Sequence, residues 1–279
     1  MIQGNIALCI SVVTYDTPRK TLKSTLCSLI AAVEELQHVA PSISVIITLV
    51  NNNEKILIGP EELKHLRANS EGATWKFHLM QGHANVGYGC GQNMAFFAQC
   101  STYHLFMNPD VELEPDCLVE GILFLETHLD VGIASPQARN DDGDKQFLCK
   151  QYPTVWIFLI RGFFPKIFRR VFRKQIRYYE MQNLSEAAPT KKIPIVSGCF
   201  MLCRSKIIET VSGFDPRYFL YFEDFNLSLR VGDISSLAYV PAMRIRHRGG
   251  YAAKKGMHHI KLFIKSGYRF FSDHGWRWI

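Results

Sequence analysis

Short apolar runs rich in β-branched residues alternate, in the first half of the chain, with longer stretches in which apolar residues recur every three or four positions. Short runs of this kind are typical of buried strands, and the longer pattern is typical of amphipathic helices. Their alternation predicts an α/β fold with a doubly wound, mainly parallel central sheet. Strands are predicted at 6–13, 44–50, 75–80, 103–107 and 131–135, and helices at 18–36, 61–68, 93–100 and 114–128.

The pattern changes near residue 138. A polar turn at 140–144 leads into residues 156–177, where aromatic and basic side chains mix without an acidic one. Such a mixture is typical of a segment that lies on an anionic bilayer, and it also fits an ordinary basic face above a core stripe. We divide the chain, as parts of one continuous domain, at 1–138, 139–192 and 193–279.

Regular periodicity returns in the last part of the chain. A strand is predicted over 193–204, interrupted by Ser197 and Gly198, and later strands are predicted at 237–241 and 243–246. Residues 254–271 combine apolar and basic positions at helical spacing, which predicts an amphipathic basic helix.

Composition narrows the class of protein. The 279 residues are 47% hydrophobic and 12% aromatic, which indicates a packed globular chain. A formal net charge of +7 favours an anionic partner: a nucleotide, a nucleic acid or an anionic membrane. The 8 cysteines form no C-x-x-C pair, so we expect reduced thiols and a cytoplasmic location. With no basic n-region and no apolar run of about 18 residues, neither a signal peptide nor a membrane span is expected.

The central predicted strand runs directly into Asn108, Pro109 and Asp110. Because proline has no N–H, it ends the strand ladder and forces a turn. Asp110 is then held at the carboxyl end of a central strand, where open α/β sheets bind ligands. A carboxylate at this place can hold a divalent cation, and the cation can hold a diphosphate. The same tripeptide also fits a strand-ending turn that carries no chemistry.

Glycines 87, 89 and 91 precede a predicted helix, where small residues let the backbone approach a ligand closely. Their G-x-G-x-G spacing differs from the G-x-G-x-x-G dinucleotide motif, and no Lys-Ser/Thr pair follows. This excludes a dinucleotide fingerprint and a P-loop, while a tight strand-to-helix connection stays open as the alternative.

Glu223 and Asp224 follow an aromatic run and begin a predicted helix. Paired carboxylates against an apolar wall can serve as an acid/base site, because burial raises their proton affinity. An acidic pair at this position can also simply complement the helix dipole. His247 stands at a strand end before the basic, glycine-rich residues 248–250; taken alone, a histidine is usually structural.

Taken together, these motifs resemble the inverting family 2 glycosyltransferases of GT-A fold, in particular the bacterial rhamnosyltransferase-like group that builds lipopolysaccharide or other surface glycans. The resemblance covers most of the chain, and its most specific part is 197–230. It rests on the segments 13–15, 85–93, 108–110, 197–202, 213–215 and 221–230 and on His247.

The resemblance implies a Rossmann-like, mainly parallel sheet flanked by helices, with acceptor-side helical elements toward the C-terminus. It also implies Mg²⁺ or Mn²⁺ at Asp110 and His247, and catalysis by Asp224 with Glu223 beside it. The residues that it places on the acceptor side are Ser197, Gly198 and Phe222. Those that it places at the donor are Thr14, Tyr15, Asn52, Asn85, Gly87, Tyr88, Gly91, Asn93 and Asn108.

The implied reaction transfers L-rhamnose from dTDP-L-rhamnose to a glycan or lipid-linked glycan acceptor. Two positions depart from the family pattern: Asn51 and Asn52 stand where many relatives have aspartate, and Asn226 replaces the second aspartate of Glu-Asp-x-Asp. The alternatives are another donor such as a UDP-hexose, a nucleotidyltransferase, or a non-enzymatic protein that binds an anionic ligand or nucleic acid. No nucleic-acid partner is expected, because the stacking-aromatic and basic sheet motifs are absent.

The acceptor class implied by the resemblance would place the enzyme on the cytoplasmic face of the inner membrane as a peripheral protein. We expect a salt-sensitive association with an anionic membrane surface, because aromatic and basic residues alternate in 156–177 and again toward the C-terminus. The residues expected to make this contact are Phe163, Phe164, Arg169, Arg170 and Arg173.

Overall fold

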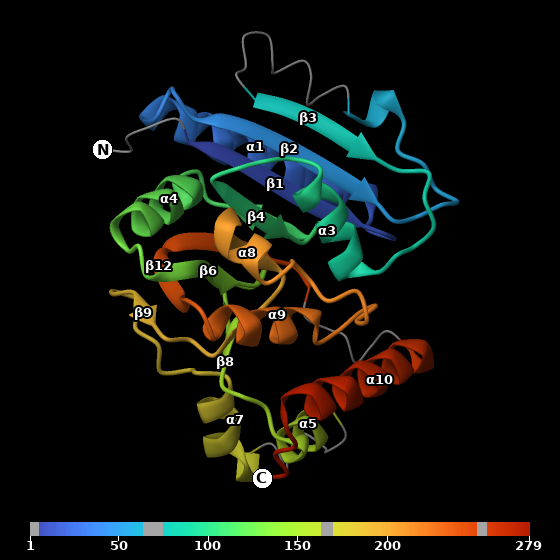
Figure 1. The fold of residues 1–279 in the computed structure, drawn as a ribbon, viewed down its shortest axis with the longest axis vertical. Helices are drawn as coiled ribbons and strands as arrows, with labels where there is room; N and C mark the ends of the chain where they lie inside the picture. The colour runs from blue at the N-terminus through green and yellow to red at the C-terminus, as the bar shows by residue number, and fades with distance from the viewer. Residues whose placement is uncertain (1–5, 64–74, 163–169, 250–255) are drawn as a thin grey trace.

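The computed structural model describes residues 6–63, 75–162, 170–249 and 256–279 and arranges them around one twisted sheet (Figure 1). Of the helix predicted at 61–68, only the 3-10 helix η1 (Pro60–Leu63) is described, and the remainder lies outside the described residues. Phe163, Phe164 and Arg169, predicted to contact a membrane, also lie outside them.

The first half of the sheet is parallel. The strands β1 (Ala7–Thr14), β2 (Ser44–Asn51), β3 (Trp75–Met80) and β4 (Tyr103–Met107) lie in the order β3-β2-β1-β4. All three pairings are parallel, as the alternation of strand and helix predicted. The carboxyl ends of β1, β2 and β4 therefore meet at one edge, where the donor-side segments begin.

The second half of the sheet is mixed. β11 (Phe200–Arg204) lies antiparallel between β4 and β6 (Val131–Arg139), and β12 (Ser236–His247) runs parallel to β6. β5 (Val111–Leu113) closes the sheet antiparallel to β12. The two late strands predicted at 237–241 and 243–246 are one strand, β12, whose pairing with β6 shifts register between Val240 and Arg244.

Helices cover both faces of the sheet. One apolar cluster joins α1 (Arg19–Val39) and α4 (Cys117–Thr127) to one face. Another joins α3 (Tyr88–Phe97), α8 (Ser205–Thr210) and α9 (Glu223–Gly232) to the opposite face. Along β4, Leu105 and Met107 belong to the first cluster and Phe106 to the second, as the two-residue period of a strand requires.

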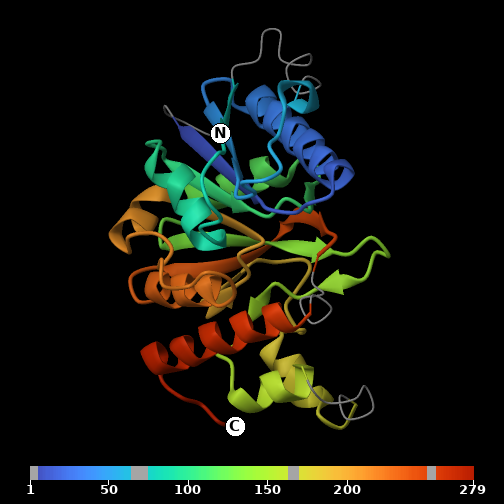
Figure 2. The same ribbon diagram turned by 90° about the vertical axis from the view of Figure 1, so that its right-hand side faces the viewer.

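A third group of elements lies below the sheet in Figures 1 and 2: α5 (Val155–Gly162), α7 (Arg173–Tyr179) and α10 (Met257–His274). Phe222, Phe270 and Phe271 form a buried cluster there, with Phe158 packed against it. Phe158 thus faces the protein interior. The remaining short strands are β7 (Lys145–Gln146), β8 (Cys149–Lys150), β9 (Thr190–Lys191) and β10 (Ile195–Val196).

Candidate functional site

The turn after β4 is held by hydrogen bonds from three different elements. The Asn108 N–H donates to the Cys199 carbonyl at 2.9 Å, and the Thr25 hydroxyl of α1 donates to the Pro109 carbonyl at 3.0 Å. The Arg248 N–H, just after β12, donates to the Asp110 carbonyl at 3.0 Å. The turn predicted from the tripeptide is therefore rigidly placed at the carboxyl edge of the sheet.

His247 lies beside Asp110, as the resemblance implied. Its Nε2 is 3.5 Å from Asp110 Oδ1, and its side chain is 9% exposed. The Gln146 amide nitrogen donates to the His247 carbonyl at 2.8 Å, which turns the Gln146 oxygen toward Nδ1 at 2.7 Å. Nδ1 is therefore the donor to Gln146, and Nε2 faces the carboxylate of Asp110. The Gln146 side chain thus orients the imidazole through Nδ1, as the hydrogen-bond partners of histidine ligands do in many metal sites.

Gly249 has no side chain and so leaves space next to Asp110 Oδ2 and His247 Nε2. A Cβ at this position would lie 2.4 Å from Asp110 Oδ2 and 2.8 Å from His247 Nε2. Among the described residues no group of three or more potential metal ligands occurs. A carboxylate and an imidazole nevertheless fit a cation such as Mg²⁺ or Mn²⁺, whose remaining positions are commonly taken by waters and substrate phosphates.

The predicted base, Asp224, is held by backbone donors on both oxygens. The Gly198 N–H donates to Oδ2 at 2.8 Å, and the Phe225 N–H donates to Oδ1 at 2.9 Å. A Cβ at position 198 would lie 2.9 Å from the Asp224 Cβ, so only glycine fits there without displacement. Burial raises the pKa of Asp224 in spite of these donors.

Glu223, the neighbouring carboxyl, is 6% exposed, and its Oε2 has no hydrogen-bond partner among the described residues. Burial first, and the charge of Asp224 next, raise the pKa of Glu223 well above its ordinary value. Two adjacent buried carboxyls cannot both ionise cheaply, and Asp224 has the better-stabilised anion. The geometry therefore favours ionisation of Asp224 over ionisation of Glu223.

The backbone just before this pair is strained. Tyr221 and Phe222 both adopt left-handed conformations, with φ of 69° and 65°, and such residues cost about 1–3 kcal/mol each. Helix α10 holds the segment in place. The Ser266 hydroxyl donates to the Leu220 carbonyl at 2.8 Å, and the Tyr221 hydroxyl lies 2.8 Å from His259 Nδ1.

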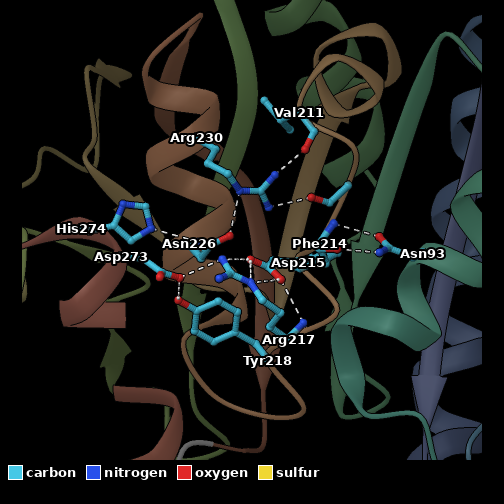
Figure 3. Close-up of polar contacts among 11 residues, drawn as sticks. Asn93, Val211, Phe214, Asp215, Arg217, Tyr218, Asn226, Arg230, Asp273 and His274 are labelled. Atoms are coloured by element: carbon cyan, nitrogen blue, oxygen red, sulfur yellow. Dashed lines mark hydrogen bonds and ion pairs between the residues drawn. The ribbon is translucent and has the colours of Figure 1, made fainter. Parts of the chain in front are cut away.

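Asp273 extends the contact between α10 and this loop. Asp273 accepts two hydrogen bonds from the loop. Arg217 donates to it at 2.9 Å, and the Tyr218 hydroxyl donates to it at 3.2 Å (Figure 3). The α10 residues His259, Ser266 and Asp273 are seven apart in sequence and so share one face of the helix. A seven-residue repeat of polar positions was the available sequence signal for this role, which the sequence analysis missed.

Asn226, where the family pattern has a second aspartate, is buried and structural here. Its Nδ2 donates to His274 Nε2 at 3.0 Å, and its Oδ1 accepts from Arg230 Nε at 2.8 Å (Figure 3). Arg230 in turn donates to the carbonyls of Val211 and Gly213. Asn226 therefore connects α9 to the end of α10.

Most of the predicted donor-side amides point into the protein. Asn93 makes two hydrogen bonds to the backbone of Phe214, at 2.7 and 2.8 Å (Figure 3). Asn52 is 1% exposed, donates to the Gly87 carbonyl at 2.8 Å and lies 3.0 Å from His83 Nε2. Asn85 accepts from the Gly87 N–H at 3.0 Å. The structure gives these residues a positioning role, and direct contact with a donor stays a prediction.

The glycine segment approaches another loop of the protein very closely. Gly87 has φ of 83°, and a Cβ there would lie 2.2 Å from the Phe219 carbonyl oxygen. The Tyr88 N–H donates to that oxygen at 3.1 Å, and the Tyr88 hydroxyl donates to the Gly198 carbonyl at 2.6 Å. A Cβ at Gly91 would lie 3.1 Å from the Val13 side chain. The segment thus connects the donor edge to both loops around Asp224.

The remaining predicted residues lie at the edge of the site. Thr14 is buried at the end of β1, whereas Tyr15 is 55% exposed. Ser197 precedes Gly198 in the turn between β10 and β11, and its hydroxyl accepts from the Cys199 N–H at 3.4 Å. Phe222 packs against Phe263 and Phe270, which places it between Glu223 and α10.

Comparisons with known proteins bear on this arrangement. No family model matches the sequence. The chain is 26% identical over 216 residues to N-acetylglucosaminyl-diphospho-decaprenol L-rhamnosyltransferase of Mycobacterium tuberculosis, covering 71% of this chain and 68% of that protein. It is 27% identical over 148 residues to rhamnosyltransferase WbbL of Escherichia coli K12, covering 52% of each.

Solved structures agree with the fold. GalNAc-T7 with UDP, GalNAc and Mn²⁺ matches 97% of this chain and 48% of its own length, with a TM-score of 0.63 and 13% identity. Staphylococcus aureus TarS 1–349 matches 96% of this chain and 73% of its own length, with a TM-score of 0.55 and 11% identity. The predicted fold class is thereby confirmed. The chain is a glycosyltransferase of GT-A-type fold, similar in sequence to bacterial rhamnosyltransferases.

Proposed function

We propose that the chain transfers L-rhamnose from dTDP-L-rhamnose to a hydroxyl of a lipid-linked glycan acceptor, with inversion at the anomeric carbon. One observation carries the mechanism. Neighbouring residues of a single turn contact both halves of the site, since the Gly198 N–H binds Asp224 and the Cys199 carbonyl binds Asn108 beside Asp110. The names of the sequence relatives support the sugar and the acceptor class.

In the proposed reaction, Asp224 accepts the proton of the acceptor hydroxyl as its oxygen forms a bond to the anomeric carbon. The bond from that carbon to the diphosphate breaks at the opposite face, and the diphosphate leaves with the electron pair. The raised pKa of Asp224 makes it a stronger proton acceptor than an exposed carboxylate. The N–H groups of Gly198 and Phe225 fix its orientation.

Asp110 and His247 would hold the Mg²⁺ or Mn²⁺ of this reaction. When bound, the cation neutralises charge that develops on the leaving diphosphate. The Gly249 backbone leaves the room that a diphosphate oxygen needs beside the two ligands. Gln146, which sequence reasoning missed because its short strand carries no motif, keeps the His247 ring in the binding tautomer.

The test is transfer by the purified protein with dTDP-L-rhamnose, Mg²⁺ or Mn²⁺ and a set of lipid-linked sugars. Product mass and the anomeric coupling in NMR would report the sugar and its configuration. Parallel reactions with UDP-hexoses address the alternative donor. Release of dTDP that requires the acceptor and gives an inverted product is the expected result. Acceptor-dependent turnover with a UDP-sugar alone would overturn the donor assignment.

We further propose that the enzyme works as a peripheral protein on the anionic cytoplasmic face of the inner membrane. No helix in the described part of the chain is long and apolar enough to cross a membrane. In Figures 1 and 2 the helices α5 and α7 and the C-terminus lie at the same end of the molecule. The exposed residues there include Arg170, Val171, Arg173, Arg177, Trp276 and Trp278.

The end of the molecule formed by α5, α7 and the C-terminus offers both electrostatic attraction to anionic lipids and aromatic rings that favour the membrane interface. Each basic residue close to an anionic leaflet contributes about 1 kcal/mol, and indole rings favour the interface between headgroups and acyl chains.

A further inference from the structure

Two cations lie around the buried Tyr179 on the segment 139–192, which reaches the Asp224 side of the molecule through β8. The Lys150 ammonium lies 5.8 Å from the centre of the Tyr179 ring, and the Arg161 guanidinium lies 5.4 Å from it. Tyr179 is 3% exposed, and its hydroxyl makes no hydrogen bond of standard geometry to a described residue. A buried hydroxyl without such a bond is costly, and it is free to donate to a ligand oxygen.

The backbone places this cluster beside Asp224. Lys150 of β8 pairs with Ile195 of β10, the strand that leads into Gly198. The Gln151 N–H donates to the Tyr179 carbonyl at 2.9 Å, which joins the end of α7 to the end of β8. Burial raises the pKa of Asp224, and the charge of Lys150 opposes that shift; burial also raises the pKa of Tyr179, and the charge of Asp224 adds to it.

One acidic side chain pairs with a cation of the cluster. Glu180 lies 3.2 Å from Arg161 and neutralises one cation. The ammonium of Lys150 donates to the Phe147 carbonyl. Burial first, and the charge of Arg161 next, lower the pKa of Lys150 to about 8 although Glu180 opposes the shift. A protonated Lys150 would therefore be stabilised by a further anion.

We propose that Lys150, Arg161 and Tyr179 form an acceptor subsite that binds a phosphate group next to the sugar that receives rhamnose. Ammonium, guanidinium and hydroxyl groups are all donors to phosphate oxygens. Arg161 is 37% exposed in its side chain, which gives a ligand access from the outer surface. This inference rests on the proposed function for the identity of the ligand, a sugar carried on a lipid phosphate or diphosphate. The subsite would select acceptors by their phosphate and bring their hydroxyl to Asp224.

The experiment measures binding of farnesyl diphosphate by calorimetry, with saturating dTDP and Mg²⁺ present to fill the donor site. The informative variants are Tyr179→Phe, which removes only the hydroxyl, and Lys150→Met, which removes the ammonium together with its hydrogen bond to the Phe147 carbonyl. We expect each to weaken binding about tenfold, a loss of about 1.4 kcal/mol. Farnesol, which lacks the phosphates, should not bind. The matched controls are Tyr178→Phe, on the exposed side of α7, and Lys206→Met, on the surface of α8.

Thermal unfolding separates this role from a structural one. Because the Tyr179 hydroxyl makes no hydrogen bond of standard geometry to a described residue, Tyr179→Phe should melt close to the wild type while losing affinity. Failure of farnesyl diphosphate to bind the wild type, or equal affinity in Tyr179→Phe, would overturn the subsite. A phospholipid headgroup as the true ligand would instead show as weaker flotation of Tyr179→Phe with phosphatidylglycerol vesicles and no effect on farnesyl diphosphate, which also overturns it.

Failure of the proposed function gives a different pattern. In that case farnesyl diphosphate still binds through Lys150 and Tyr179, but dTDP-L-rhamnose is not turned over with any lipid-linked sugar. The subsite would then stand without the transfer reaction.

Discussion

The Gly198 N–H lies 2.8 Å from Oδ2 of Asp224, and the neighbouring Cys199 carbonyl accepts the N–H of Asn108 at 2.9 Å. One turn between β10 and β11 thus sets the position of Asp224 relative to the turn that carries Asp110. A change in this turn would therefore displace Asp224 and the Asp110 turn at the same time.

Asp224→Asn keeps the shape of the side chain and removes the proton acceptor. We expect transfer to fall by about two to four orders of magnitude while donor binding is nearly retained. Initial rates and dTDP affinity by calorimetry measure the two effects separately. Near-normal turnover in this variant would move the base elsewhere, with Glu223 as the next candidate.

Gly198→Ala would place a Cβ 2.9 Å from the Asp224 Cβ and push the carboxylate away from its backbone donors. We expect a loss of about 1–3 kcal/mol in the free energy of unfolding, together with a lower kcat. Urea unfolding and steady-state kinetics provide the readouts. Gly232→Ala is the matched control, because its Cβ would meet no described atom closer than 3.9 Å. Equal stability of the two variants would contradict the close packing described at Gly198.

Asp110→Ala removes one of the two cation ligands. We expect metal-dependent donor binding to be lost, because the diphosphate loses its counter-ion. Thermal shift with dTDP, with and without Mn²⁺, measures this loss. Adding dTDP and Mn²⁺ together should raise the melting temperature of the wild type and leave that of the variant unchanged. Full activity of the wild type in excess chelator would show that the metal assignment is wrong.

Glu223→Gln tests the neutral state of the buried carboxyl. The raised pKa means that the folded protein binds the Glu223 proton more tightly than the unfolded chain does. The free energy of unfolding therefore falls as the pH rises from the ordinary carboxyl value toward the raised pKa. Since glutamine stays neutral, the variant should gain melting temperature relative to the wild type at pH 8 and gain little at pH 4. A variant that is less stable than the wild type at both pH values would argue for a charged, partnered Glu223.

The triple variant Arg170→Glu, Arg173→Glu and Arg177→Glu tests the membrane surface. We expect flotation with anionic vesicles at low salt to be lost in the variant and weakened in the wild type by added salt. Binding of dTDP with Mg²⁺ serves as the control for folding. Equal flotation of variant and wild type would leave α7 as an ordinary solvated basic face.

The sequence by itself determined the elements whose signals are local. A buried strand ending in Asn108, Pro109 and Asp110 follows from an apolar run and a proline, and the helix that begins at Glu223 follows from spacing and an acidic start. The similarity of motifs was enough to indicate a glycosyltransferase, because motif residues stay in order along the chain even when the intervening segments change.

Only the tertiary structure decided how these elements meet. The antiparallel insertion of β11 between β4 and β6 brings Gly198 to Asp224, and strand pairing between segments so far apart leaves no local sequence signal. The amide of Asn93 turns inward because Phe214, 121 residues away, offers it two backbone partners. Lys150 and Tyr179 come together for the same reason: burial and charge depend on neighbours that folding supplies, and the order of residues does not specify them.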